Sequence, residues 1–173
     1  GTLPLFVPFA ISQLRAPQSA VGTYVSISVA FSLAATFLWG RISDVQGNRR
    51  LLLLGSMALI VAPAIALGVR WVPELPVRAL GAETLRQAVF PLVFAASGFA
   101  AQGASIGDTN YLLEIAPPRR RVSYIGFLNV VSIPLFAIPA LAGLMAKAVS
   151  YYAVFALSGG AALVAVAIAG SLE

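Results

Sequence analysis

Long apolar runs alternate with short polar clusters along the whole chain. At about 1.5 Å of rise per residue, about 20 residues cross the hydrocarbon of a bilayer, and five runs reach that length: 20–39, 51–69, 88–113, 122–146 and 151–170. Hydrocarbon offers no partners to open strand edges, and period-two alternation is absent, so the pattern predicts helices. We expect an all-α fold, a polytopic membrane helix bundle forming a single domain over residues 1–173.

A shorter apolar segment precedes these five runs. Residues 2–12 are too few to span a bilayer, and they lack the basic start of a secretory signal. The chain begins with Gly1 rather than methionine. We interpret residues 1–14 as the end of a helix whose first part is missing, and the chain as a fragment.

The composition fits a lipid environment and excludes several kinds of chemistry. Hydrophobic residues make up 60% of the chain and charged residues 10%, with a mean hydropathy of +0.92; soluble domains carry roughly 25% charged residues. The chain has no Cys and no His, which removes disulfides, Cys/His metal sites and histidine-based catalytic pairs. We expect no cofactor and no metal. We also expect no nucleic-acid partner, because the arginines form short clusters between apolar runs.

The distribution of basic residues predicts the orientation of the spans. Loops 41–50 and 115–121 hold six cations in 17 residues, whereas loops 11–18, 70–87 and 147–150 hold five cations in 30 residues. The positive-inside rule places the denser pair of loops in the cytoplasm. We therefore expect an integral protein of the bacterial cytoplasmic (inner) membrane.

Polar side chains are concentrated in three of the five spans. Polar groups in hydrocarbon usually face a bundle interior or a wet cavity. Spans 20–39, 88–113 and 122–146 are thus expected to line a solute path, and the other two spans to face lipid. The candidates for this path are Tyr24, Ser28, Ser32, Gln102, Ser105, Asp108, Asn110 and Asn129.

Two alternatives remain open for these polar residues. The serines recur every four residues, so they could instead be small residues at a helix contact; Gly103 and Gly107 have the same packing interpretation. Asp108 lies six residues before Glu114, or roughly 9 Å along a helix. It either couples a proton or a substrate cation to transport, or is a packing residue hydrogen-bonded to Asn110 or Asn129.

The segment between the first two spans carries the most specific pattern, GRISDVQGNRR from Gly40 to Arg50. A glycine at each end of a tight turn permits positive φ and close backbone approach. Asp44 can pair with arginine or accept hydrogen bonds from a helix N-terminus. Two adjacent arginines then anchor the next helix at the headgroups.

This segment resembles the signature loop of the major facilitator superfamily, G-x-x-x-D-x-x-G-x-R-R. All five defined positions are matched, by Gly40, Asp44, Gly47, Arg49 and Arg50. After the third span, a sequence similar to the family's E-x-x-P-x-x-x-R element is matched by Glu114, Pro117 and Arg121. The separation of the two matches fits the second half of the family fold.

The resemblance implies an architecture and a mechanism. The chain would comprise the end of helix seven and then helices eight to twelve, which is the C-terminal six-helix half with its first helix truncated. Members of the family are secondary active transporters, whose two halves rock around a midplane site to give a small solute alternating access. The implied partners are the lipid bilayer, a small-molecule solute and the missing N-terminal half of the same polypeptide.

The resemblance also implies roles for the motif residues. Asp44 and Arg49 would hold the cytoplasmic side closed, and Glu114 and Arg121 would form a second ionic clasp, with partners in the other half. In the family, helices seven, eight, ten and eleven line the cavity. The polar spans 20–39, 88–113 and 122–146 would be helices eight, ten and eleven. The polarity of the spans and the resemblance therefore select the same helices as the lining of the cavity.

Two other classes of function can be weighed against a transporter. An intramembrane enzyme would need a His or a second intramembrane Asp to act with Asp108, and the spans offer neither, so we expect no enzyme. A non-transporting membrane scaffold or assembly subunit stays the alternative, although a passive scaffold has no need of two gating motifs. The P-loop motif is absent, so ATP drive is not encoded in this chain.

Overall fold

The computed structural model of the protein describes residues 3–77 and 84–171, which are helical nearly throughout. The α-helices are α1 (Leu3–Gln13), α2 (Ala20–Gln46), α3 (Asn48–Gly68), α4 (Leu85–Val89), α5 (Pro91–Ile115), α6 (Arg121–Ser132), α7 (Ile138–Ala148) and α8 (Tyr151–Ser171). Three short 3-10 helices join them, η1 (Val69–Trp71), η2 (Pro118–Arg120) and η3 (Ile133–Ala137). Five segments are long and apolar enough to cross a membrane, so the predicted all-α polytopic bundle is confirmed.

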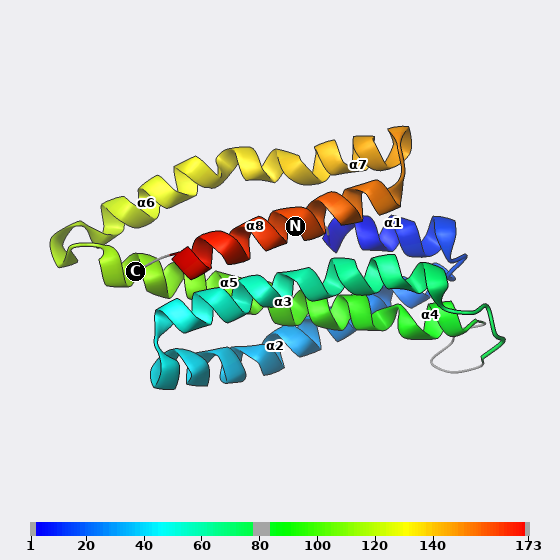
Figure 1. Ribbon diagram of the computed structural model, residues 1–173, viewed down its shortest axis with the longest axis horizontal. Helices are drawn as coiled ribbons and strands as arrows, with labels where there is room; N and C mark the ends of the chain where they lie inside the picture. The colour runs from blue at the N-terminus through cyan, green and yellow to red at the C-terminus, as the bar shows by residue number, and fades with distance from the viewer. Residues whose placement is uncertain (1–2, 78–83, 172–173) are drawn as a thin grey trace.

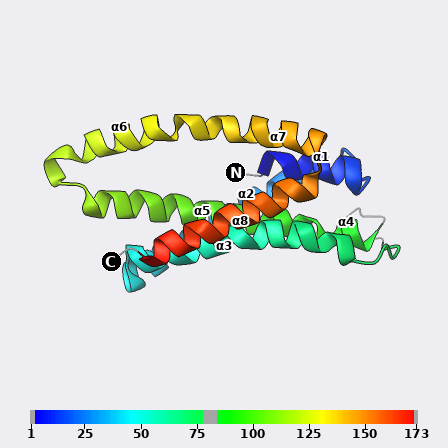
Figure 2. The same cartoon turned by 45° about the horizontal axis from the view of Figure 1, so that its top comes forward.

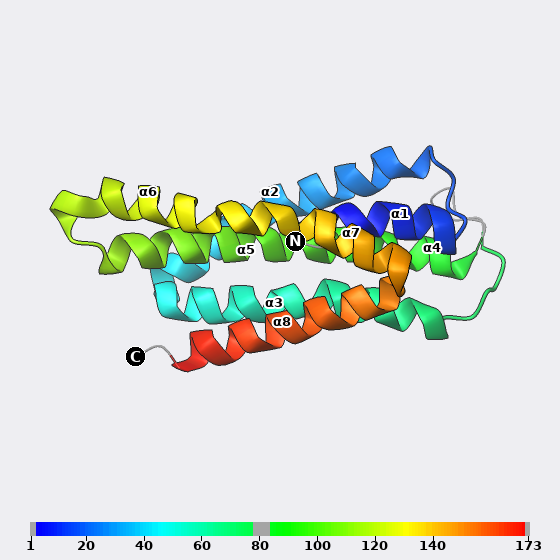
Figure 3. The same cartoon turned by 90° about the horizontal axis from the view of Figure 1, so that it is seen from above.

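Helix α5 lies at the centre of the bundle. It packs against α2 on one side and against α3 on the other, and α3 in turn packs against α8. Figure 3 shows α3 and α8 side by side along most of their length. The second span was expected to face lipid, yet α3 contacts α2, α5 and α8. Its remaining side exposes Leu54, Met57 and Val61, so facing lipid stays a prediction for that side alone, because an apolar, Ala- and Gly-rich helix packs against other helices as readily as against acyl chains.

Glycines allow the central helices to approach closely. A Cβ on Gly103 of α5 would lie 2.5 Å from the indole of Trp39 on α2, and a Cβ on Gly55 of α3 would lie 3.0 Å from the backbone of Gly103. The indole Nε1 of Trp39 donates to the carbonyl of Phe99 at 2.9 Å. Small residues at helix contacts are typical of membrane bundles, so the structure gives Gly103 the packing role that was one of its interpretations.

An aromatic cluster holds α1 against the bundle. Phe6 and Phe9 of α1 are fully buried with Phe90, Phe94 and Phe155. The ring of Phe9 meets that of Phe155 with centroids 5.1 Å apart in an edge-to-face arrangement. Pairs of this kind stabilise by about 0.5–1.5 kcal/mol beyond the area they bury. Contacts between aromatic side chains therefore hold α1 against the bundle, although the helix is short.

The last polar span is broken in its middle. Pro134 and Pro139 lie within or next to η3, which separates α6 from α7. Proline removes a backbone donor and clashes with the preceding turn, which accounts for the break. Every residue of α6 except Ser132 is exposed, and Figure 2 shows the α6–α7 segment standing apart from α3 and α5 along much of its length. This span contacts the rest of the chain mainly through α7, which packs against α8 and α1.

The motif loop is shorter than the sequence predicted. Helix α2 continues to Gln46 and α3 starts at Asn48, so Gly47 is the one residue that interrupts the helices in the expected loop 41–50. Gly47 has φ +82° and donates its N–H to the carbonyl of Ser43. Gly40, in contrast, is an ordinary helical residue. Polar residues beyond the hydrocarbon can continue a helix, and the expectation of a loop at 41–46 was wrong for that reason.

Figure 1 shows the turns that join the helices at the two ends of the bundle. At the end that holds α4, Arg86 pairs with Glu74 and donates to the carbonyls of Val72 at 2.7 Å and of Arg70 at 3.1 Å. Its neighbour Gln87 donates to the carbonyl of Leu14 at 2.8 Å. Two adjacent side chains thus fasten the segment after α3 and the turn after α1 to the start of the third span.

Candidate functional site

The polar stripe of α2 faces α5 rather than an open path. Tyr24 is only 5% exposed, and its ring stacks on Phe94 with centroids 5.1 Å apart. Ser28 is buried where Gly98 of α5 crosses. Both residues were candidates for the solute path, and the packing interpretation accounts for them instead.

Further along the same contact, α2 and α5 are joined by a polar pair. The hydroxyl of Ser32 donates to Oε1 of Gln102 at 3.2 Å, and both side chains are half-buried. Thr36, one turn on, donates to the carbonyl of Ser32 within its own helix. Gln102 therefore lies at the border between the α2 contact and the uncovered side of α5.

The uncovered side of α5 carries the remaining candidates. Ser105 and Asp108 are exposed, as is Ala101, and these positions share one helix face at intervals of four and three residues. Figure 3 shows α6 lying over this part of α5 in the view from above. Asn129 of α6 is also exposed.

Asp108 has no partner within residues 3–77 and 84–171, where one ion pair is found, between Arg86 and Glu74. The alternative interpretation of Asp108 required a hydrogen bond to Asn110 or Asn129. The structure shows neither: Asn110 donates instead to the hydroxyl of Ser43 at 3.0 Å. Asp108 is thus a carboxylate on the uncovered face of a membrane-spanning helix.

A chain of hydrogen bonds closes the end of the bundle that carries the signature motif. Asn110 of α5 donates to Ser43 of α2, whose hydroxyl donates to Oδ1 of Asn48 at 2.6 Å. The amide of Asn48 donates to Oε2 of Glu114 at 3.0 Å. The network ties α5 to the α2–α3 junction twice. Ser43 and Asn48 were not among the residues predicted from the sequence. The sequence did place both of these polar residues at unspecified positions of the signature, on either side of Gly47, and this was the one feature that could have pointed to them.

The remaining motif residues lie at the same end of the bundle. Asp44 and Arg50 are exposed, and Arg49 donates from Nη2 to the carbonyl of Gly170, the penultimate residue of α8, at 3.4 Å. Pro117 precedes η2, and Arg121 is the first residue of α6. In the part of the chain that the structure describes, none of the charged motif residues forms an ion pair. Their charges are therefore available to another segment or to another molecule.

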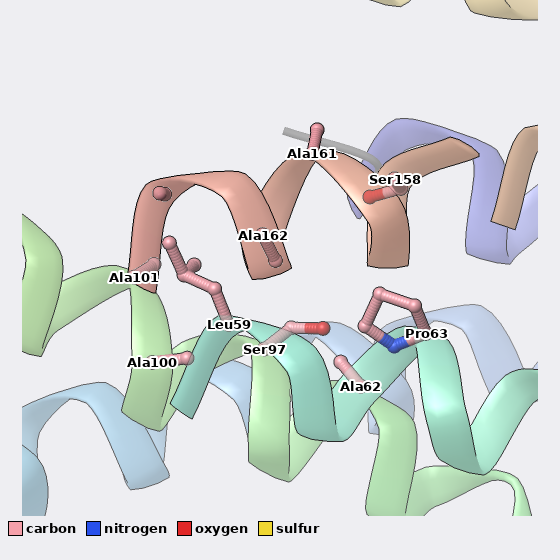
Figure 4. A pocket seen from close by; sticks show the side chains of 10 residues that line it. Leu59, Ala62, Pro63, Ser97, Ala100, Ala101, Ser158, Ala161 and Ala162 are labelled. Atoms are coloured by element: carbon pink, nitrogen blue, oxygen red, sulfur yellow. The ribbon is translucent and has the colours of Figure 1, made fainter. Parts of the chain in front are cut away.

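A cavity of about 280 Å³ lies between α3, α5 and α8, away from these candidates. Figure 4 shows its lining of small side chains, with Leu59 and Pro63 of α3 below α8 and Ser97 of α5 between them. The hydroxyl of Ser97 donates to the carbonyl of Val93, so it is already satisfied. None of the polar candidates lines this cavity, and its apolar wall offers little to a polar solute.

The described residues hold no group of three or more acidic, His or Cys side chains placed to bind a metal ion. Exposed carboxylates, amides and guanidinium groups make up the chemistry of the candidate site. Such groups bind and release polar solutes and form interhelical contacts.

Comparison with known proteins identifies a family for the chain. No curated protein and no solved structure matched the chain. The model of the Major Facilitator Superfamily matches residues 1–172, which is essentially the whole chain. Together with five helices that can cross a bilayer, this match shows that the chain belongs to the Major Facilitator Superfamily and is an integral membrane protein of transporter type.

Proposed function

We propose that the chain is the C-terminal half of a secondary active transporter that moves a small solute by alternating access. The observation that carries the proposal is the exposed carboxylate of Asp108 on a membrane-spanning helix, without a partner in the described part of the chain. A charge at this depth is costly unless it faces water, a solute or a partner helix. A solute path along the uncovered face of α5 would contain water, and this water would solvate the Asp108 carboxylate.

The proposed path runs between α5 and the α6–α7 segment. Ser105 and Asp108 line it from α5, and Asn129 lines it from α6, with Gln102 at its edge. The proline break next to η3 lets α6 and α7 change their relative angle during transport. The N-terminal half of the polypeptide would form the opposite wall.

The signature residues provide the closure of the cytoplasmic side in this proposal. Asp44, Glu114 and Arg121 are exposed at the same end and have no ion-pair partner in the described residues, so their partners would lie in the other half, whereas Arg49 contacts the end of α8. Binding of solute between the halves offsets the cost of breaking these contacts, and the transporter then opens to the inside. The protein would act in the bacterial inner membrane.

Thiol labelling tests the path without knowledge of the solute. This chain contains no Cys, so labelling of a single Cys introduced into it is measured against the unsubstituted full-length protein as background. We expect Ser105→Cys and Asn129→Cys, in the full-length protein in vesicles, to react with a charged methanethiosulfonate reagent. Leu163→Cys is the control, because Leu163 of α8 is 59% exposed on an apolar helix and would face acyl chains.

The two outcomes of this labelling are distinct. Fast reaction at Ser105→Cys with slow reaction at Leu163→Cys supports a wet path along α5. Equal protection of Ser105→Cys and Leu163→Cys would show that the α5 face is in lipid, and the proposed path would be wrong. The same measurement on Ser28→Cys should show protection, since Ser28 is buried against Gly98.

A further inference from the structure

A basic pocket lies between the start of α3 and the end of α8, apart from the proposed solute path. It has a volume of about 360 Å³ and is lined by Gln46, Arg49, Arg50, Leu53, Ala169 and Gly170. Figure 3 shows the α2–α3 junction beside the last turn of α8, which is the arrangement that forms this pocket. The pocket thus joins the α2–α3 junction to the end of α8, with Arg49 and Gly170 separated by 121 residues in sequence.

The charge of the pocket is uncompensated. Arg49 makes one polar contact, the 3.4 Å hydrogen bond to the carbonyl of Gly170, and Arg50 is exposed. A guanidinium has five N–H donors, so most donors of both arginines are unused. Neither arginine has a carboxylate partner within residues 3–77 and 84–171. Two adjacent guanidinium groups match the oxygens of a phosphate in charge and in geometry.

The remaining lining indicates what kind of phosphate fits. Leu53 and Ala169 give the pocket an apolar floor. Beyond it, the outer surfaces of α3 and α8 stay apolar, with large exposed side chains at Leu54, Met57, Val61, Leu163, Val164 and Ile168. A soluble phosphate would use only the arginines, whereas a phospholipid would also cover the floor and the apolar helix surfaces that lead away from it.

We propose that this pocket binds the phosphate of an anionic phospholipid, with Arg49 and Arg50 around the headgroup and the acyl chains along α3 and α8. The site lies at the end of two membrane spans, where headgroups are found. Among the described residues its lining offers two positive charges and no carboxylate to pair with a headgroup ammonium, so it favours phosphatidylglycerol over phosphatidylcholine. The lipid would fasten the α2–α3 junction to the end of α8.

The preference of the pocket for an anionic phospholipid can be measured as the amount of each lipid that the purified protein retains. The full-length protein is equilibrated in detergent with equal amounts of phosphatidylglycerol and phosphatidylcholine, and retained lipid is counted by native mass spectrometry. We expect a preference for phosphatidylglycerol that falls about fivefold in Arg50→Gln and again in Arg49→Gln. Arg120→Gln is the matched control: it removes one charge from exposed η2 at the same end of the bundle and should leave retention unchanged.

A second variant tests the pocket without altering charge. A Cβ at position 170 would lie 3.9 Å from Cδ1 of Leu53, an ordinary contact, so Gly170→Leu can fold while filling the space. We expect it to lose the preference for phosphatidylglycerol. Equal retention of the two lipids by the wild type would overturn the proposal, as would an equal loss in Arg120→Gln and Arg50→Gln. Displacement of the lipid by inorganic phosphate at equal concentration would also overturn it, because the pocket would then be a soluble-anion site.

Discussion

Gly98 of α5 crosses Ser28 of α2 so closely that a Cβ on Gly98 would lie 2.1 Å from the carbonyl oxygen of Ser28. The obstacle is backbone, which cannot move aside without separating the two helices. The same crossing buries the Ser28 side chain. The α2–α5 interface therefore depends on the absence of one side chain at this point.

Gly98→Ala should destabilise the protein for this reason. Overpacking a contact typically costs about 1–3 kcal/mol, and we expect the upper part of that range because the clash is with main chain. Thermal unfolding in detergent micelles, followed by circular dichroism, measures the effect. Gly126→Ala on exposed α6 meets nothing within 4 Å and is the control, with no loss of stability expected. Equal melting temperatures for the two variants would contradict the close crossing.

The two signature glycines should respond oppositely to alanine. Gly47 has φ +82° and ψ 163°, a region populated essentially by glycine that costs other residues about 1–3 kcal/mol, so Gly47→Ala should lower the unfolding free energy by about that amount. Gly40 is helical with open space around its Cβ position, so Gly40→Ala should be neutral or stabilising by up to about 1 kcal/mol. The comparison of the two melting temperatures checks both signs at once. A larger loss in Gly40→Ala than in Gly47→Ala would show that the turn is built differently.

The extent of the membrane spans could be predicted from sequence because it depends on summed hydropathy. Length and apolar composition set five spans, but the break near Pro134 and Pro139 within the fourth of them was not predicted. Whether each polar side chain faces a cavity or a neighbouring helix could not be predicted in the same way. Tyr24 and Ser28 have the right period for a cavity wall and equally for a helix contact, and only the position of Gly98 decides between them.

The hydrogen-bond network at the end of the bundle that carries the signature motif shows a second limit of prediction from sequence. Ser43 and Asn110 are 67 residues apart, and Asn48 and Glu114 are 66 apart. One sequence gives no means to pair residues at such separations, so these hydrogen bonds within the chain were not predicted, and the charged contacts that the motif implies, with the other half, stay a prediction. Helix continuation past residue 40 was missed because charged residues were taken to mark a loop, although helices extend beyond the hydrocarbon.

Ser43→Ala should loosen the junction of α2, α3 and α5. The Ser43 hydroxyl both accepts from Asn110 and donates to Asn48, so its removal leaves two half-buried polar groups unpaired, at a cost of about 1–2 kcal/mol. Unfolding in detergent gives the value. Ser171→Ala is the matched control, since the Ser171 hydroxyl is exposed and donates within its own helix to Ile168. A loss in Ser43→Ala no greater than that in the control would mean that water replaces the network without cost.

Asp44→Asn should slow transport without weakening solute binding. Asp44 is exposed beside the α2–α3 junction and has no ion-pair partner in the described residues, so under the proposed mechanism its charge acts across the interface with the other half. Neutralising it changes the balance between inward- and outward-open states, while the solute-binding residues on α5 and α6 are untouched. Uptake into proteoliposomes containing the full-length protein should show a lower maximal rate with little change in KM. Asp44→Glu keeps the charge and should recover part of the rate. A variant that loses affinity but keeps its rate would place Asp44 in the solute path, and unchanged turnover would remove it from the closure altogether.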